Sequence, residues 1–537
     1  MDYDEEVPVL IVGAGPVGLS TALFLARQGI RPTLVEKRSG TSVLPRAPGL
    51  QARTMELFRA AGAGADVRAL EIGDSHEYFE GGILRVNTFA EIDDAVLLES
   101  PSLDGERISP ERVMGCGQDR YETVLMARAT DAGATLHFGT RLVDLHQDAT
   151  GVTATVEDVE SGDRRRFRAR YLVGADGARS KVREVLGVPR SGRGNVFNAM
   201  SIYFRAPELD ELLQGRKFIL CYAMAGGVMV GLSRLHGQDP WLAAPLYHPE
   251  DGESPADFSD ERCVEVVRTA AGRADLDVEI VAKVPWEGAQ LVAERFRVGR
   301  VFLAGDAAHL HPPAGGFGAN TGIHDAHNLA WKLTAALRGQ GGEGLLDSYD
   351  AERRPLGAAM AEQAMVRNRI RHGIAKPDDH ERMVDDIIIT LGYRYRSTAL
   401  TGADSPDVLV PRLELLGEPG TRAPHVWLDR AGERISTIDL FFGSWVLLTG
   451  VEGDAWAKAA AVVAERLPVP LQCYRIGPGG DLADPEQRWA QAYGVTGNGA
   501  VLVRPDAFVA WRSADEVAEP DVVLAEALAR MADVPLR

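Results

Sequence analysis

Three glycine-bearing segments, far apart in the sequence, constrain the fold of this chain most strongly. They are Gly13-Ala14-Gly15-Pro16-Val17-Gly18, Gly174-Ala175-Asp176-Gly177 and Ala304-Gly305-Asp306-Ala307-Ala308-His309, and each follows a short apolar run that predicts a β-strand. One such loop carries little information, because glycine occurs wherever a chain turns tightly. Three in this order indicate one long dinucleotide that is contacted at three places.

The first segment has the surroundings of a dinucleotide-binding turn. Residues 7–12 predict a strand, and residues 17–28 have the apolar spacing of a helix. In such a unit Gly13 permits the tight turn, Gly15 lets the backbone approach a pyrophosphate, and Gly18 lets the helix pack closely on the strand. The unpaired amides of the helix N-terminus then face the phosphates.

Glu36 makes this interpretation specific. It ends a second predicted strand, residues 32–35, where a carboxylate accepts hydrogen bonds from the ribose hydroxyls of an adenosine. A carboxylate there disfavours a 2′-phosphate, so NADP is not the expected ligand of this loop.

The third segment indicates that the dinucleotide is FAD. A strand predicted over residues 299–304 leads into Gly305-Asp306, where the carboxylate can bind the ribityl hydroxyls of a flavin. A glycine-rich loop, residues 312–322, then feeds a long helical run, and its amides suit the negative charge of a reduced flavin ring. His309 and His311, or His324 and His327, are not expected to bind a metal, because no cysteine or third ligand accompanies them.

The order of these motifs resembles that of the single-component (class A) FAD-dependent aromatic hydroxylases. With its C-terminal region included, the chain is most similar to bacterial aromatic polyketide hydroxylases of the aklavinone and angucycline type. The resemblance implies an α/β fold with a Rossmann-like FAD-binding domain of the para-hydroxybenzoate hydroxylase type, a β-rich substrate domain and a C-terminal thioredoxin-like α/β domain. The expected boundaries are 1–180 and 291–394 for the FAD-binding domain, 181–290 for the substrate domain and 395–537 for the C-terminal domain.

The resemblance and the motifs together give a set of candidate site residues. Catalytic residues stay unknown, with Arg46, Pro313 and Gly316 as the candidates. The expected cofactor-binding residues are Gly13, Gly15, Pro16, Val17, Gly18, Glu36, Lys37, Arg46, Gln118, Asp176, Gly177, Gly305, Asp306, Pro313, Gly316, Gly318, Ala319 and Asn320. The expected substrate pocket contains Tyr222, Met224, Met229, Trp286 and Pro313, although aromatic residues in strands are often plain core.

The C-terminal region predicts a small α/β unit. Strands are expected over residues 437–440, 445–449, 469–476 and 500–504, with an alanine-rich helix over residues 456–466. A Cys-x-x-Cys pair is missing from the sequence, so the redox role of a true thioredoxin is excluded. We interpret this unit as packing or dimer-supporting structure.

The resemblance implies a monooxygenase. NADH or NADPH would reduce FAD, and a flavin C4a-hydroperoxide would transfer one oxygen atom from O₂ to a polycyclic aromatic polyketide in secondary metabolism. Alternatives with the same fold are Baeyer-Villiger or ring-rearranging oxygenation and the inactivation of a tetracycline-type antibiotic. An alternative of another class is a flavin-binding scaffold without turnover.

Composition excludes several other partners. Acidic residues outnumber basic ones by 77 to 58, and the formal charge of −19 repels nucleic acid. The acidic N-terminus differs from a signal peptide, and the absence of long apolar runs predicts no membrane association. The four cysteines are widely spaced, which favours a cytoplasmic location. A monomer or a homodimer is expected.

Overall fold

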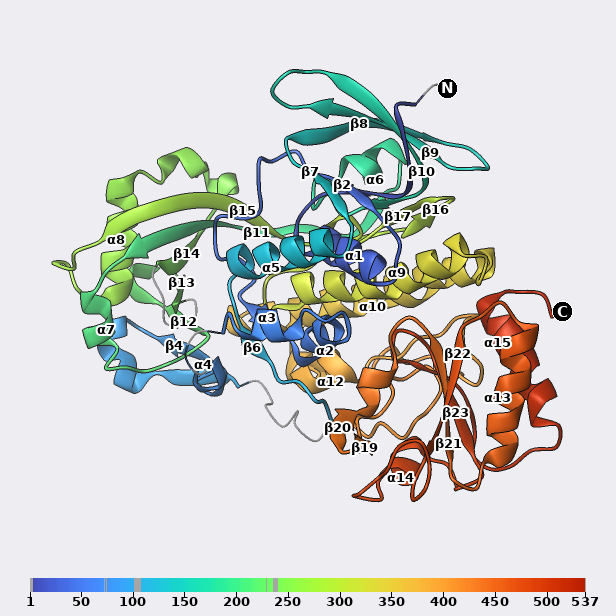
Figure 1. Ribbon diagram of the computed structural model, residues 1–537. Helices are drawn as coiled ribbons and strands as arrows, with labels where there is room; N and C mark the ends of the chain where they lie inside the picture. Colours follow the sequence, from blue (N-terminus) through green and yellow to red (C-terminus); the bar gives the residue numbers. More distant parts are fainter. Residues whose placement is uncertain are drawn as a thin grey trace.

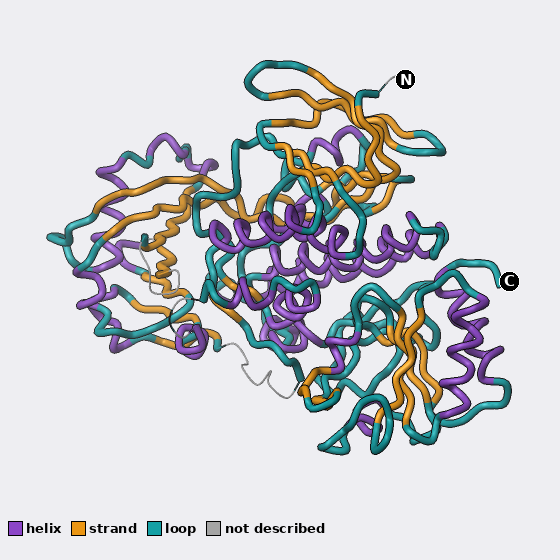
Figure 2. Tube along the Cα trace, in the orientation of Figure 1, coloured by secondary structure: helices purple, strands orange, loops and turns teal. Residues whose placement is uncertain are grey.

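The computed structural model describes residues 3–71, 73, 75–100, 108–227, 229–234 and 240–536. Figure 1 shows long helices across the middle of the molecule, a β-rich region on one side and a C-terminal α/β unit on the other. The tube in Figure 2 shows the same division, with the N-terminal strands above the central helices. This architecture confirms the expected α/β fold class.

The first sheet contains the strands that precede the three glycine segments. Its order is β16-β17-β10-β1-β2-β7, with β9 beside β10 and β8 beside β9. Residues 9–12 of β1 are fully or almost fully buried, as expected of a central parallel strand with helices on its faces. The strands are β1 (Glu5–Val12), β2 (Thr33–Val35), β7 (Thr135–His137), β8 (Thr140–Gln147), β9 (Val152–Asp158), β10 (Arg164–Gly174), β16 (Arg297–Val298) and β17 (Val301–Leu303).

Helices pack around this sheet and carry the loops of the site. Helix α1 contacts both α5 and α9, and α9 contacts α10. The helices of this region are α1 (Pro16–Arg27), α2 (Ala52–Ala60), α3 (Gly64–Arg68), α4 (Ser75–Glu80), α5 (Gln118–Asp131), α6 (Lys181–Val185), α9 (Phe317–Leu337), α10 (Glu343–Arg371), α11 (Asp379–Arg382) and α12 (Asp386–Leu391). Short strands β3 (Gly49–Leu50) and β6 (Met114–Gly115) pair beside them.

The second sheet is the β-rich region. Its order is β18-β15-β11-β14-β13-β12-β4-β5, and α8 (Asp260–Ala271) covers one face. Alternate residues of β11 and β14 pack in one core with α8. The opposite face of the sheet lies on the side of α10. The strands are β4 (Ile83–Val86), β5 (Val96–Glu99), β11 (Arg190–Arg205), β12 (Leu220–Ala223), β13 (Val230–Arg234), β14 (Trp241–Tyr247), β15 (Glu279–Ala293) and β18 (His309–Leu310).

Strands β4 and β5 differ from the boundary expected for this region. They lie within residues 1–180, which we expected to belong to the FAD-binding part, yet β4 pairs in parallel with β12 of the second sheet. Parallel pairing between segments so distant in sequence leaves no local signal, so periodicity does not reveal it. Short helices of this region are η1 (Phe89–Asp94), α7 (Glu208–Leu212), η3 (Ala225–Gly227), η5 (Pro249–Asp251) and η6 (Pro255–Asp257).

The C-terminal unit contains a sheet in the order β22-β21-β23-β24. Its elements are β19 (Trp427–Arg430), β20 (Glu433–Ser436), η8 (Thr437–Leu440), β21 (Trp445–Gly450), α13 (Asp454–Arg466), β22 (Leu471–Ile476), α14 (Trp489–Tyr493), β23 (Ala500–Val503), β24 (Val509–Ser513) and α15 (Pro520–Ala532). The strand expected over residues 437–440 is wrong. These residues form a 3₁₀ turn, because Ser436 and Asp439 make a reciprocal capping box.

The core of the C-terminal unit continues into the long helices. Trp331 on α9 packs edge-to-face on Trp445 of β21, with ring centroids 5.8 Å apart. Leu345, Leu356 and Met360 belong to the same buried cluster. The unit is therefore packed firmly against α9 and α10. Among the described residues, every helix is too short or too polar to cross a membrane.

Candidate active site

The register of the first sheet brings the predicted motifs together. Val35, Val12, Gly174 and Leu303 are consecutive partners across β2, β1, β10 and β17. These strands are parallel, so the loops that follow them leave the same edge of the sheet. Glu36 and the three glycine segments, which range from Gly13 to His309 in the sequence, thus lie side by side.

One group of glycines serves close packing. A Cβ on Gly18 would lie 3.0 Å from the carbonyl carbon of Gly13, and a Cβ on Gly322 would lie 3.0 Å from Cα of Gly305. Gly305 has φ of +59°, and a Cβ there would lie 2.7 Å from a Val17 methyl group. These positions have no room for a side chain, so they fix α1 and α9 against the strand ends.

A second group of glycines faces open space. A Cβ on Gly15, Gly177, Gly316 or Gly318 would meet no atom within 4 Å. Gly15 is the N-cap of α1, and Gly316 is the N-cap of α9, so both expose backbone amides at helix N-termini. A ligand that approaches the backbone closely, with phosphate at one end and a polar ring at the other, fits this arrangement.

Asp306 has the environment of a ligand-binding carboxylate. Its side chain is exposed, yet the surrounding protein desolvates the carboxyl group and raises its pKa, an effect that the nearby His309 opposes. Within the described part of the chain, no hydrogen-bond donor reaches this carboxylate. An orphaned acceptor at this edge of the sheet fits the hydroxyl groups of a ribityl chain.

Glu36 and Asp176 already have partners within the protein. Glu36 accepts the N–H of Ala14 at 2.8 Å and the N–H of Arg38 at 2.9 Å, which ties the second strand to the first turn. Asp176 accepts the Val182 N–H at 3.0 Å and the hydroxyl of Ser180. The Asp176 carboxylate thus holds the start of α6.

The remaining predicted cofactor residues lie at different depths. Pro16 begins α1, Val17 is half-buried, and Lys37 is exposed. Gln118 begins α5, where its side chain donates to Glu122 at 2.6 Å.

Arg46 lies beside the second sheet. Its side chain is exposed and lies near the hydroxyl of Tyr203 on β11, where it opposes the rise that burial causes in the pKa of that hydroxyl. Its carbonyl accepts the Gln118 N–H at 2.9 Å. Arg46 thus joins the first sheet's loops to the wall of the β-rich region.

The buried side chain of Asn320 holds the loop before α9 in place. Asn320 donates to the carbonyls of Gly49 at 2.9 Å and Gly316 at 3.0 Å, and accepts from Gln51 N–H and the Thr54 hydroxyl. Ala319 is half-buried beside it, and Pro313 and Gly316 are exposed. The Asn320 side chain therefore shapes the loop, while the loop backbone faces outward.

The substrate-pocket candidates separate into two groups. Tyr222 and Trp286 lie close to one aromatic cluster, whereas Met224 is 43% exposed after β12 and Met229 is half-buried before β13. Trp286 packs edge-to-face on Phe197, with centroids 5.4 Å apart. The structure brings together the two aromatic residues and leaves the two methionines at the strand ends.

Several residues of this region were missed in the sequence. The His372 ring lies 5.6 Å from that of Phe197 and 6.1 Å from that of Tyr222, so it connects the cluster to the end of α10. Arg371 donates to Glu99 of β5 at 2.8 Å and contacts the Tyr222 hydroxyl. Glu99 reaches this region because β5 pairs with β4 and β4 pairs with β12, and no motif marks this pairing.

Comparison with known proteins places this geometry in a family. Residues 6–364 match the family model of an FAD binding domain, and residues 417–535 match that of the aromatic-ring hydroxylase C-terminal domain. The chain is 44% identical to tetracenomycin A2 monooxygenase-dioxygenase of Streptomyces glaucescens, with 99% of this chain and 98% of that protein covered. It is 41% identical to 4-methyl-5-nitrocatechol 5-monooxygenase of a Burkholderia species, with 98% and 97% covered.

A solved structure agrees with these relatives. The ternary complex of aklavinone-11 hydroxylase with FAD and aklavinone superimposes with a TM-score of 0.91 at 39% identity, covering 99% of this chain and 100% of that one. The open glycines and the orphaned Asp306 carboxylate fit FAD. NADH or NADPH is the reductant typical of such enzymes. The chain therefore belongs to the FAD-dependent aromatic-ring hydroxylases and is an FAD-dependent monooxygenase.

Proposed function

We propose that this enzyme inserts one oxygen atom from O₂ into a polycyclic aromatic polyketide during antibiotic biosynthesis, at the expense of NADH or NADPH. The relatives named for tetracenomycin and aklavinone support this substrate class. The observation that carries the proposal is the half-exposed, aromatic-bordered face of the second sheet beside the glycine-rich loop.

The proposed FAD site uses the residues gathered at the edge of the first sheet. Gly15 and the N-terminus of α1 hold the pyrophosphate, Glu36 lies at the adenosine end, and Asp306 binds the ribityl chain. The amides that begin α9 lie at the flavin ring. Bound FAD supplies electron transfer from the nicotinamide and the activation of O₂.

The proposed substrate surface combines small residues with large aromatic borders. Tyr222 pairs with Gly231, which pairs with Ala244 on β14. A Cβ on Gly231 would lie 3.4 Å from the Tyr222 ring, so glycine leaves room for this ring beside β13. Ala199 pairs with Trp286 farther along the same face. A flat floor with aromatic borders suits stacking with a planar polycyclic substrate.

Access to this face supports the same assignment. Along β14, residues alternate between buried and half-exposed, as in a strand with one face in a core and the other incompletely covered. The buried residues pack with α8, and the half-exposed ones include Ala244 and Leu246. The half-exposed residues of β14 thus lie on the face of the sheet that α10 contacts through β15.

Tyr222 provides a polar contact on this surface. Burial raises the pKa of the Tyr222 hydroxyl, against the effect of Arg371, so the group stays protonated at neutral pH. It can donate a hydrogen bond to a phenolate or quinone oxygen of the substrate. Arg371, which is paired with Glu99, lies near this hydroxyl.

Substrate-stimulated oxidation of NADPH tests the proposal. Polycyclic aromatic polyketides should accelerate NADPH oxidation, with a product heavier by one oxygen atom. A single-ring nitrocatechol is a necessary comparison, because one relative is named for that substrate. Acceleration by the nitrocatechol alone would replace the proposed substrate class and retain the monooxygenase. Acceleration by no aromatic compound would favour a flavin-binding scaffold.

The connectivity of the product distinguishes hydroxylation from ring rearrangement. A hydroxylated ring keeps its carbon skeleton, whereas a Baeyer-Villiger product contains a new ester. The relative named as a monooxygenase-dioxygenase makes the number of oxygen atoms added informative as well. We propose a monomer or a homodimer, which light scattering of the holoenzyme measures directly.

A further inference from the structure

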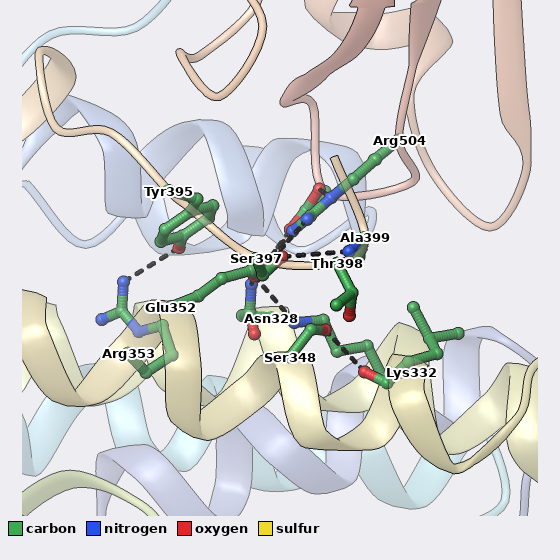
Figure 3. Close-up of polar contacts among 12 residues, drawn as sticks. Asn328, Lys332, Ser348, Glu352, Arg353, Tyr395, Ser397, Thr398, Ala399 and Arg504 are labelled. Atoms are coloured by element: carbon green, nitrogen blue, oxygen red, sulfur yellow. Dashed lines mark hydrogen bonds and ion pairs between the residues drawn. The ribbon is translucent and has the colours of Figure 1, made fainter. Parts of the chain in front are cut away.

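A buried ion-pair network joins the C-terminal unit to the two long helices (Figure 3). Arg504, directly after β23, donates to both oxygens of the Glu352 carboxylate on α10, at 2.6 and 2.9 Å. Lys332 on α9 donates to the same carboxylate at 2.7 Å, and Arg504 Nε donates to Asp506 at 2.9 Å. All four groups are buried. Two carboxylates thus balance two cations, as a buried network requires.

The network reaches the flavin site through the residue next to Glu352. Arg353 donates from Nε to Asp325 Oδ1 at 2.6 Å, and Asp325 Oδ2 accepts the N–H of Gly305 at 3.0 Å. Gly305 immediately precedes Asp306, the orphaned carboxylate of the site. The position of Arg353 on α10 therefore affects the position of the backbone at Gly305 and Asp306.

Tyr395 connects the two arginines a second time. Its hydroxyl accepts from Arg353 Nη1 at 2.9 Å, and the Arg504 guanidinium lies 5.5 Å from the centre of its ring. Figure 3 shows Tyr395 beside Arg353 and Arg504 above Glu352. Arg353 and Arg504 are thus linked twice: through Glu352, which precedes Arg353 on α10, and through the Tyr395 side chain.

Asp506 provides a separate route to the flavin-ring loop. Its carbonyl accepts a hydrogen bond from Arg53 of α2 at 2.6 Å. The next residue of α2, Thr54, donates to Asn320 at 2.6 Å, and Asn320 holds the loop at Gly316. Both routes from the C-terminal unit end on backbone of the proposed FAD site.

We propose that Arg504 is a positioning residue of the FAD site and that the C-terminal unit is part of the flavin-binding machinery. The fork of Arg504 fixes Glu352, and α10 then holds Arg353 and Asp325 against Gly305. A network that only fastened the unit would not need to end on two flavin loops. The inference rests on the FAD site and is independent of the identity of the substrate.

The test is a charge-balanced double variant, Glu352→Gln with Arg504→Met. It removes one carboxylate and one cation together, so Lys332 and Asp506 still balance each other. We expect the FAD dissociation constant, measured by flavin fluorescence on titration of the apoprotein, to rise at least tenfold. The midpoint potential of the bound flavin is expected to shift as well, because the loops around it move.

A matched control lies on the same helix. Arg369 of α10 makes a two-pronged ion pair with the buried carboxylate of Asp379, and this pair holds α11. The variant Arg369→Met with Asp379→Asn also removes a buried ion pair, but it leaves Gly305 and Asn320 untouched. It should lower the melting temperature and keep the wild-type FAD dissociation constant and potential.

If the double variant does not fold, the conservative variant Arg504→Lys tests the proposal. Arg504→Lys keeps the charge, but one ammonium group cannot reproduce the fork to Glu352 and Asp506. We expect intact folding with an FAD dissociation constant raised several-fold. Wild-type values of the dissociation constant and potential in the folded double variant, or in Arg504→Lys, would overturn the proposal and leave the network a structural fastening.

Discussion

The carboxylate of Glu56 on α2 forms a fully buried ion pair with Arg422 of the C-terminal region, 366 residues away in sequence. Arg422 Nε lies 3.0 Å from Glu56 Oε2, and Arg53 donates to the same oxygen at 2.9 Å. Ser109 donates to the other oxygen at 2.6 Å. The junction between the two regions therefore contains a buried, charged hydrogen-bond network.

Replacing Glu56 by Gln should destabilise the protein by about 3–5 kcal/mol, because two buried arginines lose their carboxylate. Chemical denaturation of both proteins measures this. Burial opposes ionisation of Glu56, but Arg422 and Arg53 outweigh it and lower its pKa to about 2. A lowered pKa contributes stability above the ordinary carboxyl range that is lost as the pH falls. The difference between wild type and variant should thus shrink between pH 4.5 and about 2; a constant difference would contradict the assignment.

The two kinds of glycine predict opposite outcomes for Gly→Ala substitutions. Gly15→Ala has room for its methyl group and a φ of −75°, so the apoprotein should keep its melting temperature. The methyl group would occupy the pyrophosphate position and weaken FAD binding at least tenfold. Gly18→Ala should instead unfold the turn, because its methyl group meets the Gly13 carbonyl. Calorimetry of the apoproteins and FAD titration separate the two; equal effects would refute the division.

Asp306→Ala should weaken FAD binding about 10- to 100-fold, since hydrogen bonds to a charged group contribute roughly 1.5–3 kcal/mol. Retention of flavin through gel filtration is the measurement. A purified variant with normal FAD content and turnover would show that this segment does not bind the ribityl chain.

Substitution of Asp306 by Asn should stabilise the apoprotein. Desolvation raises the pKa of Asp306, so its ionised form is disfavoured in the folded apoprotein. Stability is then greatest below the ordinary carboxyl pKa and falls as the pH rises through the raised value. Asp306→Asn apoprotein should be more stable than wild-type apoprotein at neutral pH, and the two should converge at acidic pH. Equal stability at neutral pH would argue against an unpaired carboxylate.

A substitution on the proposed substrate surface should change KM without loss of cofactor. Trp286→Leu removes an aromatic border and should raise KM for a polycyclic substrate roughly tenfold, the scale of an aromatic anchor. FAD content should stay at the wild-type level. Trp241→Leu, on the opposite, α8-covered face of the sheet, should lower the melting temperature and leave KM unchanged. The reverse pattern would place the substrate elsewhere.

The cofactor edge of the fold was predictable because its signals are local. Gly13, Gly15 and Gly18 occupy fixed positions in one turn, and Glu36 and Asp306 directly follow apolar strands. Parallel strands bring such loops together without further information. The order of the motifs and the resemblance they carry then identified FAD and the monooxygenase class.

The substrate side was not predictable in the same way. His372 follows a long helix and Glu99 ends a strand that joins a sheet formed mostly by residues beyond 190. Arg504 and Asp506 have no motif, and their partners Glu352 and Asn328 lie on other elements. Such contacts depend on tertiary packing between distant segments, which local periodicity does not encode.

The most direct test of the central claim is turnover under isotopically labelled O₂ with NADPH and a polycyclic aromatic polyketide. We expect one labelled oxygen atom in the product, with consumption of NADPH that depends on the substrate. A product without the label, or NADPH oxidation that yields only hydrogen peroxide with every aromatic substrate, would contradict it.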